Sequence, residues 1–158
     1  MSNTKEQWMR QAIALAVGNV RQGRGGPFGA VVVRNGELIS SAVNIVTESL
    51  DPTAHAEVVA IRNACIQLGT YQLEDCELYT SCEPCPMCLG AIYWARIERF
   101  YFSATRVNAA AAGFDDAFIY DEMNLDPEQR SIAGHALLSS EGGAAFTEWE
   151  QSLNKALY

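Results

Sequence analysis

Two short motifs constrain the fold of this chain most, because their side chains suit one metal ion and must therefore meet in space. The first is His55-Ala56-Glu57 and the second is Pro84-Cys85-Pro86-Met87-Cys88. An imidazole nitrogen and two thiolates are ligands that select a borderline ion such as Zn²⁺. A fold that satisfies this chemistry has to bring two separate segments of the chain to one point.

The spacing within the first motif places it at the start of a helix. His55 and Glu57 are two residues apart, so on the side of a helix they would point away from each other. At a helix N-terminus both side chains can reach past the helix end toward a common point. The segment Asp51-Pro52-Thr53 lies just upstream, and Thr53 is a suitable N-cap residue.

The second motif also fits a helix N-terminus. Cys85 and Cys88 are three residues apart and therefore lie on one helix face, while Pro84 or Pro86 suits the first turn. Two helix N-termini that point at one site contribute partial positive charge, which favours thiolates and a bound anion. The sequence therefore predicts that both motifs present their side chains from helix starts.

The number of ligands separates a catalytic metal site from a structural one. Three protein ligands leave the fourth tetrahedral position open, as in catalytic zinc sites. Cys82 is the one nearby candidate for a fourth ligand, but a closed site would leave Glu57 without a function. We therefore expect His55, Cys85 and Cys88 to bind one Zn²⁺ per chain.

Glu57 is the expected catalytic residue. A catalytic zinc ion lowers the pKa of a coordinated water toward ~7, and a nearby carboxylate that is not a ligand can take that proton and pass it on. A C-x-x-C pair alone is often a redox pair, and a lone His-Ala-Glu is usually a local cap. The combined H-x-E and P-C-x-x-C pattern is the signature of zinc-dependent nucleobase deaminases.

Composition limits the setting in which such a site works. With 158 residues the chain is expected to form a single domain, residues 1–158, and its cysteine spacing does not fit a secreted disulfide framework. We expect a cytoplasmic protein that does not enter a membrane, since neither a signal peptide nor a long apolar run is evident. The formal net charge of −8 disfavours a nucleic-acid partner.

Hydrophobic periodicity and turn signals predict helices that alternate with strands, and hence an α/β fold with a central sheet covered on both faces. The expected strands are 28–34, 37–43, 77–81, 97–103 and 132–139, with an Asn-Gly hairpin turn at residues 35–36. The expected helices lie around residues 8–20, 58–69, 86–95, 107–112 and 144–157. His135 would then be a structural residue within the last strand.

Longer segments extend the match beyond the metal motifs. Residues 25–31 (GGPFGAV), 51–57 (DPTAHAE), 79–96 (YTSCEPCPMCLGAIYWAR) and 112–116 (AGFDD), together with the terminal Tyr158, resemble bacterial guanine deaminases of the small, cytidine-deaminase-fold type. The resemblance implies a three-layer α/β/α fold with a central mixed sheet. It also implies a homodimer in which the C-terminal segment, about residues 140–158, is swapped between subunits.

The same resemblance implies a substrate and the residues that hold it. The reaction would be hydrolysis of guanine by water to xanthine and ammonia. Asn44 and Phe28 would hold the purine base, and Asp116 with the partner subunit's Tyr158 would complete the pocket. An amide can donate and accept at a base edge, a carboxylate suits the adjacent N–H donors of guanine, and an aromatic ring can stack on the purine.

Three other interpretations remain open at this point. A tRNA-specific adenosine deaminase shares the signature, but it needs a basic surface, and this chain has 11 Lys and Arg against 19 Asp and Glu. A free cytosine or cytidine deaminase differs only in its substrate. A zinc-stabilised interaction module is the alternative outside enzymes, and the presence of Glu57 argues against it.

Overall fold

The structure is a computed structural model that describes residues 4–158, and it divides into two compact units. The first unit ends at Asp116 and the second is Ala117–Tyr158.

Among the described residues, no helix has the length and apolar character needed to cross a membrane. The first unit contains, in order, α1 (Thr4–Arg21), β1 (Gly29–Arg34), β2 (Glu37–Val43), α2 (Val46–Ser49), α3 (Ala56–Leu68), β3 (Cys76–Cys82), α4 (Pro86–Trp94), β4 (Arg99–Ala104) and α5 (Arg106–Ala111).

The first unit is built on a four-stranded mixed sheet with the strand order β2-β1-β3-β4. β1 pairs antiparallel with β2 and with β3, whereas β3 and β4 are parallel. The β1–β2 hairpin turns at Asn35 and Gly36, whose φ angles of 53° and 79° both lie in the left-handed region. Two successive positive φ angles are typical of the tight hairpin turn that Asn-Gly favours, so this predicted turn is confirmed.

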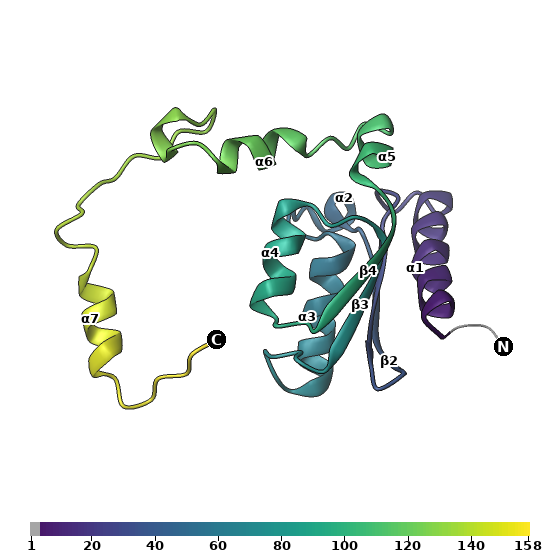
Figure 1. Ribbon diagram of the computed structural model, residues 1–158, viewed down its shortest axis with the longest axis horizontal. Helices are drawn as coiled ribbons and strands as arrows, with labels where there is room; N and C mark the ends of the chain where they lie inside the picture. The colour runs from purple at the N-terminus through teal and green to yellow at the C-terminus, as the bar shows by residue number, and fades with distance from the viewer. Residues whose placement is uncertain (1–3) are drawn as a thin grey trace. The chain divides into compact units, whose positions relative to one another are not determined.

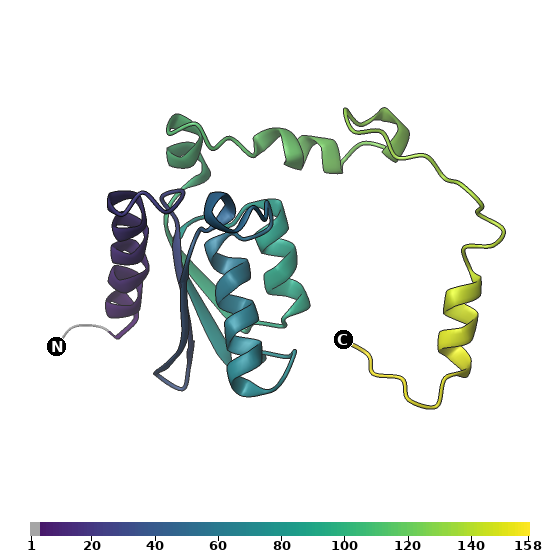
Figure 2. The same cartoon turned by 180° about the vertical axis from the view of Figure 1, so that it is seen from behind.

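Helices cover both faces of the sheet, with α1 on one side and α3 and α4 on the other (Figure 1, Figure 2). Side chains of β1 alternate between the two faces, and nearly all of them are buried. Val31 and Val33 pack with Tyr79 toward α1, while Ala30 and Val32 join the core that includes α3. The predicted three-layer arrangement of helices around a central mixed sheet is therefore confirmed.

A close approach fixes α1 against the start of β1. A Cβ atom at Gly29 would lie 2.4 Å from the carbonyl oxygen of Ala12 and 2.8 Å from the amide nitrogen of Ala16. Only glycine lets a helix backbone come this near to a strand. The contact therefore fixes α1 against the first residue of β1.

The second unit contains α6 (Ala117–Met123), a 3-10 turn η1 (Pro127–Gln129) and α7 (Ala144–Gln151). The predicted strand at residues 132–139 is wrong, because this segment is irregular and exposed. A strand needs a neighbour to satisfy its backbone groups, and in the described chain this segment has none. His135 therefore lies in an exposed irregular segment, and the last helix ends at Gln151 rather than near residue 157.

Candidate active site

His55 is the N-cap residue of α3, with an extended backbone (φ −67°, ψ 153°) and no side-chain capping bond. The prediction that Thr53 caps this helix is wrong, because Thr53 lies three residues before the helix begins and its Oγ1 donates to Asp51 Oδ1 at 2.7 Å. The imidazole of His55 is consequently not used for capping and extends beyond the helix end. The placement of the motif at a helix N-terminus is confirmed.

Cys85 occupies the equivalent N-cap position of α4, and Pro86 follows it in the first turn. The thiol sulfur of Cys85 accepts a hydrogen bond from the backbone N–H of Cys88 at 3.5 Å. This bond orients both cysteines toward the space in front of the helix. The Pro-Cys-Pro sequence thus sets Cys85 just outside the helix and Cys88 inside its first turn.

The three predicted metal ligands meet at one point. His55 Nδ1 lies 3.5 Å from the Sγ atoms of both Cys85 and Cys88, and the three ligand atoms lie within 4.8 Å of one another. Tetrahedral Zn²⁺ with Zn–N bonds of ~2.0 Å and Zn–S bonds of ~2.3 Å requires an N–S separation of about 3.5 Å. The donor set and its spacing therefore fit one zinc ion per chain.

Cys82 lies outside this cluster of ligands. It is buried, and its thiol donates to the carbonyl oxygen of Thr105 at a sulfur–oxygen distance of 3.7 Å. Burial raises the pKa of the Cys82 thiol to about 11, so it stays protonated near neutral pH. The candidate metal centre thus offers three protein ligands, and a tetrahedral ion held by them would keep one position for water or substrate.

The side chains of the cluster shift one another's pKa values. The neighbouring Cys88 and His55 side chains lower the pKa of Cys85 to about 4. The neighbouring Cys85 sulfur and burial raise the pKa of Cys88. The hydrogen bond to Cys85 in turn raises the pKa of His55. A thiolate at Cys85 is therefore suited to bind a cation, and binding of the ion would release the protons that remain on the other two ligands.

Glu57 stands beside the cluster as a buried carboxylate, 4% exposed. Its Oε1 accepts a hydrogen bond from Thr80 Oγ1 at 2.9 Å, and its Oε2 accepts one from the Cys88 thiol at 3.4 Å. Burial raises the pKa of Glu57 above its ordinary value. A carboxyl group of raised pKa that lies next to, but outside, the metal ligands is suited to accept and return a proton.

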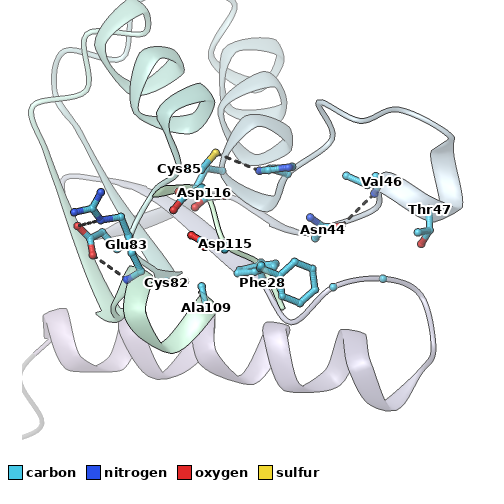
Figure 3. A pocket seen from close by; sticks show the side chains of 16 residues that line it. Phe28, Asn44, Val46, Thr47, Cys82, Glu83, Cys85, Ala109, Asp115 and Asp116 are labelled. Atoms are coloured by element: carbon cyan, nitrogen blue, oxygen red, sulfur yellow. Dashed lines mark hydrogen bonds and ion pairs between the residues drawn. The ribbon is translucent and has the colours of Figure 1, made fainter. Parts of the chain in front are cut away.

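A cavity of about 400 Å³ opens in front of the metal cluster, a size that suits a small ligand. Phe28, Asn44 and Asp116 lie around it together with Cys85 (Figure 3). His55 and Glu57 also line it, whereas Cys88 lies fully buried behind. Its lining falls within residues 25–116, so Tyr158 is not among the lining residues.

The walls of the cavity offer an amide, a carboxylate and aromatic rings. Asn44 is buried, and its Oδ1 accepts from the backbone N–H of Val46 at 3.2 Å, which leaves its N–H groups as the donors on the cavity side. Burial raises the pKa of Asp116, which is half-buried. Phe28 packs edge-to-face against Phe114, with ring centroids 5.0 Å apart and an interplanar angle of 87°.

The sequence did not predict several residues of the cavity wall. Phe114 stands in the AGFDD segment that carried part of the family resemblance, so its position could have indicated a site residue. The Glu83–Arg106 ion pair, with 3.4 Å between Oε1 and Nε, also lines the cavity. These two residues are far apart in the sequence, and no local pattern connects them.

Comparison with known proteins agrees with this site. The model of the cytidine and deoxycytidylate deaminase zinc-binding region matches residues 2–104. Guanine deaminase of Bacillus subtilis is 52% identical over 153 residues, which cover 97% of this chain and 98% of the relative. Its X-ray structure superposes with a TM-score of 0.95 over the same shares of both chains.

Another relative is named for a different activity. The tRNA-specific adenosine deaminase of Bacillus subtilis is 41% identical over 125 residues, which cover 79% of this chain and 73% of the relative. The family match includes both metal motifs and the whole sheet. The chain therefore belongs to the cytidine and deoxycytidylate deaminase zinc-binding family, with a bacterial guanine deaminase as a full-length relative.

Proposed function

We propose that this protein is a zinc-dependent guanine deaminase, which uses water to convert guanine to xanthine and ammonia. The observation that carries the proposal is the position of Glu57, which accepts a hydrogen bond from the candidate zinc ligand Cys88 and lines a cavity of about 400 Å³ together with His55 and Cys85. The full-length relationship to a guanine deaminase supports this substrate. An interaction module would have no use for a buried carboxylate in that place.

Glu57 is the proposed proton shuttle. Zinc, held by His55, Cys85 and Cys88, supplies Lewis-acid activation of a water molecule when it is bound. The Glu57 carboxylate would take a proton from the attacking water and deliver it to a ring nitrogen, while the water oxygen bonds to the amino-bearing carbon. It would then take the remaining proton of the new hydroxyl group and pass it to the amino group, so that the carbon–nitrogen bond breaks and ammonia leaves. One carboxylate would thus serve both transfers within a turnover.

The cavity walls are proposed to recognise guanine through its edge and its face. The N–H groups of Asn44 can donate to ring acceptors, and the Asp116 carboxylate can accept from the adjacent N–H donors of guanine. Adenine has an unprotonated N1 at that edge. This nitrogen is an acceptor and could not donate a hydrogen bond to the Asp116 carboxylate. Phe28 offers an aromatic ring to the purine face.

We also propose a homodimer in which the C-terminal segment, about residues 140–158, is exchanged between subunits. The second unit supports this proposal, because none of the residues described in it is buried. Its large apolar side chains include Ile132 at 88%, Leu137 at 85% and Leu153 at 99% exposed. Apolar surface of this extent normally marks an interface. The partner subunit's Tyr158 would then close the pocket over the base.

A reducing cytoplasm is the proposed location. All five cysteines are free, including the two candidate zinc ligands, Cys85 and Cys88. In an oxidising compartment Cys85 and Cys88 could be oxidised, and an oxidised pair would not bind the metal.

A tRNA-specific adenosine deaminase is the second candidate, because one relative bears that name and shares most of the first unit. Such an enzyme must grip the phosphates of an RNA stem. The formal charge of −8 opposes that contact. A free cytosine or cytidine deaminase remains an outcome of the test rather than a separate proposal.

The deciding experiment measures ammonia from the zinc-loaded protein with guanine, adenine, cytosine, cytidine or tRNA as the substrate. We expect guanine alone to turn over rapidly, with the absorbance change of xanthine formation. Release from tRNA or from another base, with guanine inert, would contradict the proposed substrate while keeping the metal site. Full zinc occupancy with no ammonia from any of the five would contradict the enzyme proposal.

A further inference from the structure

Asn19 is a buried amide in α1 that contacts two segments of the cavity wall. It is 2% exposed, and its Nδ2 donates hydrogen bonds of 2.8 Å to the carbonyl oxygens of both Gly26 and Asn44. Gly26 and Asn44 both line the cavity. One side chain outside the cavity thus connects the glycine loop after α1 with the residue that follows β2.

The two connected segments leave no space between them. A Cβ atom at Gly25 would lie 2.4 Å from the carbonyl oxygen of Asn44 and 3.2 Å from Asn19 Nδ2. Phe28 continues the set of contacts, because its N–H donates to Gly26 O at 2.9 Å and its carbonyl accepts from Asn44 N–H at 3.1 Å. The positions of Phe28 and Asn44 in the cavity therefore depend on backbone atoms that Asn19 holds.

The two polar atoms of the Asn19 amide differ in their hydrogen bonding. Both donors of Nδ2 are used, whereas Oδ1 is the one buried side-chain polar atom without a hydrogen-bond partner in the part of the chain that the structure describes. An unsatisfied buried acceptor costs free energy.

We propose that Asn19 is a positioning residue for the base-binding wall of the cavity. It acts through Gly26 and Asn44 and does not itself contact the substrate. Its chemistry is specific, because two carbonyl oxygens need two donors on one short side chain. Aspartate has the same shape but would point an oxygen at both carbonyls, and serine would supply a single donor.

The test rests on the proposed guanine deaminase function and compares the isosteric variant Asn19→Asp with the wild-type protein. We expect the KM for guanine to rise about 10-fold while kcat falls less than about 3-fold, because the zinc cluster and Glu57 are not connected to Asn19. Zinc content should be unchanged. A fall in kcat with KM constant would overturn the positioning role.

Ser40→Ala is the matched control. Ser40 is also buried and donates one side-chain hydrogen bond to a backbone carbonyl, that of Ala60 at 2.7 Å, but it does not line the cavity. We expect this variant to lose stability without a change in KM. An equal rise of KM in both variants would overturn the proposal, because general destabilisation would then explain the effect.

Hydrogen–deuterium exchange tests the same role without an assay of activity. In Asn19→Asp, the amides of residues 24–26, 28 and 44–46 should exchange faster, while those of β3 stay protected as in the wild type. If Asn19→Asp does not fold, Asn19→Ala provides the same comparison without the added charge. Unchanged exchange in both segments overturns the proposal, whereas a wild-type protein inactive on guanine contradicts the proposed function alone.

Discussion

The contact between Thr80 and Glu57 shows how single residues prepare the site. Thr80 is fully buried on β3, and its hydroxyl holds Glu57 Oε1 at 2.9 Å, so the carboxylate keeps one orientation relative to the metal ligands. The sequence could not indicate this contact, because Thr80 is a common strand residue and its partner lies on another element. The metal ligands were predictable since their residue types and spacing carry the chemistry themselves.

Replacing Thr80 by valine removes the hydroxyl but keeps the shape of the side chain. We expect kcat for guanine to fall about 10-fold, with KM unchanged, because a misoriented proton shuttle affects the reaction rather than the binding of the base. Steady-state kinetics with measured zinc content check this. Thr80→Ser should retain most of the activity, and a Thr80→Val enzyme as fast as the wild type would contradict the role.

Secondary-structure elements were predictable wherever the signal was local. The Asn-Gly turn, the strands it joins and the starts of α3 and α4 all follow from residues close together in the sequence. The segment 132–139 has a similar apolar character, but a strand depends on a neighbour that sequence alone does not reveal. The prediction of Thr53 as the N-cap of α3 was wrong because the side chain of Thr53 donates a hydrogen bond to Asp51. His55 is the N-cap residue instead.

The packing of α1 on β1 predicts that alanine substitutions at Gly29 and Gly18 change the free energy of unfolding in opposite directions. Gly29→Ala would push a Cβ atom into the backbone of α1, so we expect the free energy of unfolding to fall by about 1–3 kcal/mol. Gly18→Ala lies within α1 with no atom within 4 Å of the added Cβ, and should raise stability by about 0.5–1 kcal/mol. Urea unfolding of both variants checks this, and equal effects would contradict the close contact.

At the scale of the whole molecule, net charge and exposed apolar surface point to different partners. The excess of 19 acidic over 11 basic residues opposes polyanions and suits a small base as the substrate. The apolar side chains of the second unit, by contrast, need a protein surface to cover them. The proposed exchange with a second copy of this chain would meet both requirements, because it would cover apolar surface without a polyanion.

The proposed exchange between subunits predicts how two variants behave when they are combined in one dimer. Glu57→Gln removes the proton shuttle of its own site, and Tyr158→Ala removes the residue proposed to close the partner's site. In a mixed dimer, the site with an intact Glu57 would receive the partner subunit's Tyr158 from the Glu57→Gln chain. One of the two sites is then complete, so activity should return to roughly half that of the wild-type dimer.

Mixed dimers purified through two different tags after co-expression provide the measurement. The separate homodimers are the controls, and Glu57→Gln should lose orders of magnitude in turnover while it keeps its zinc. If Tyr158 closes the site of its own chain, the mixed dimer gains nothing, because neither site holds both groups. A mixed dimer no more active than the Tyr158→Ala homodimer would therefore contradict the exchange, and a fully active Tyr158→Ala homodimer would remove Tyr158 from the site altogether.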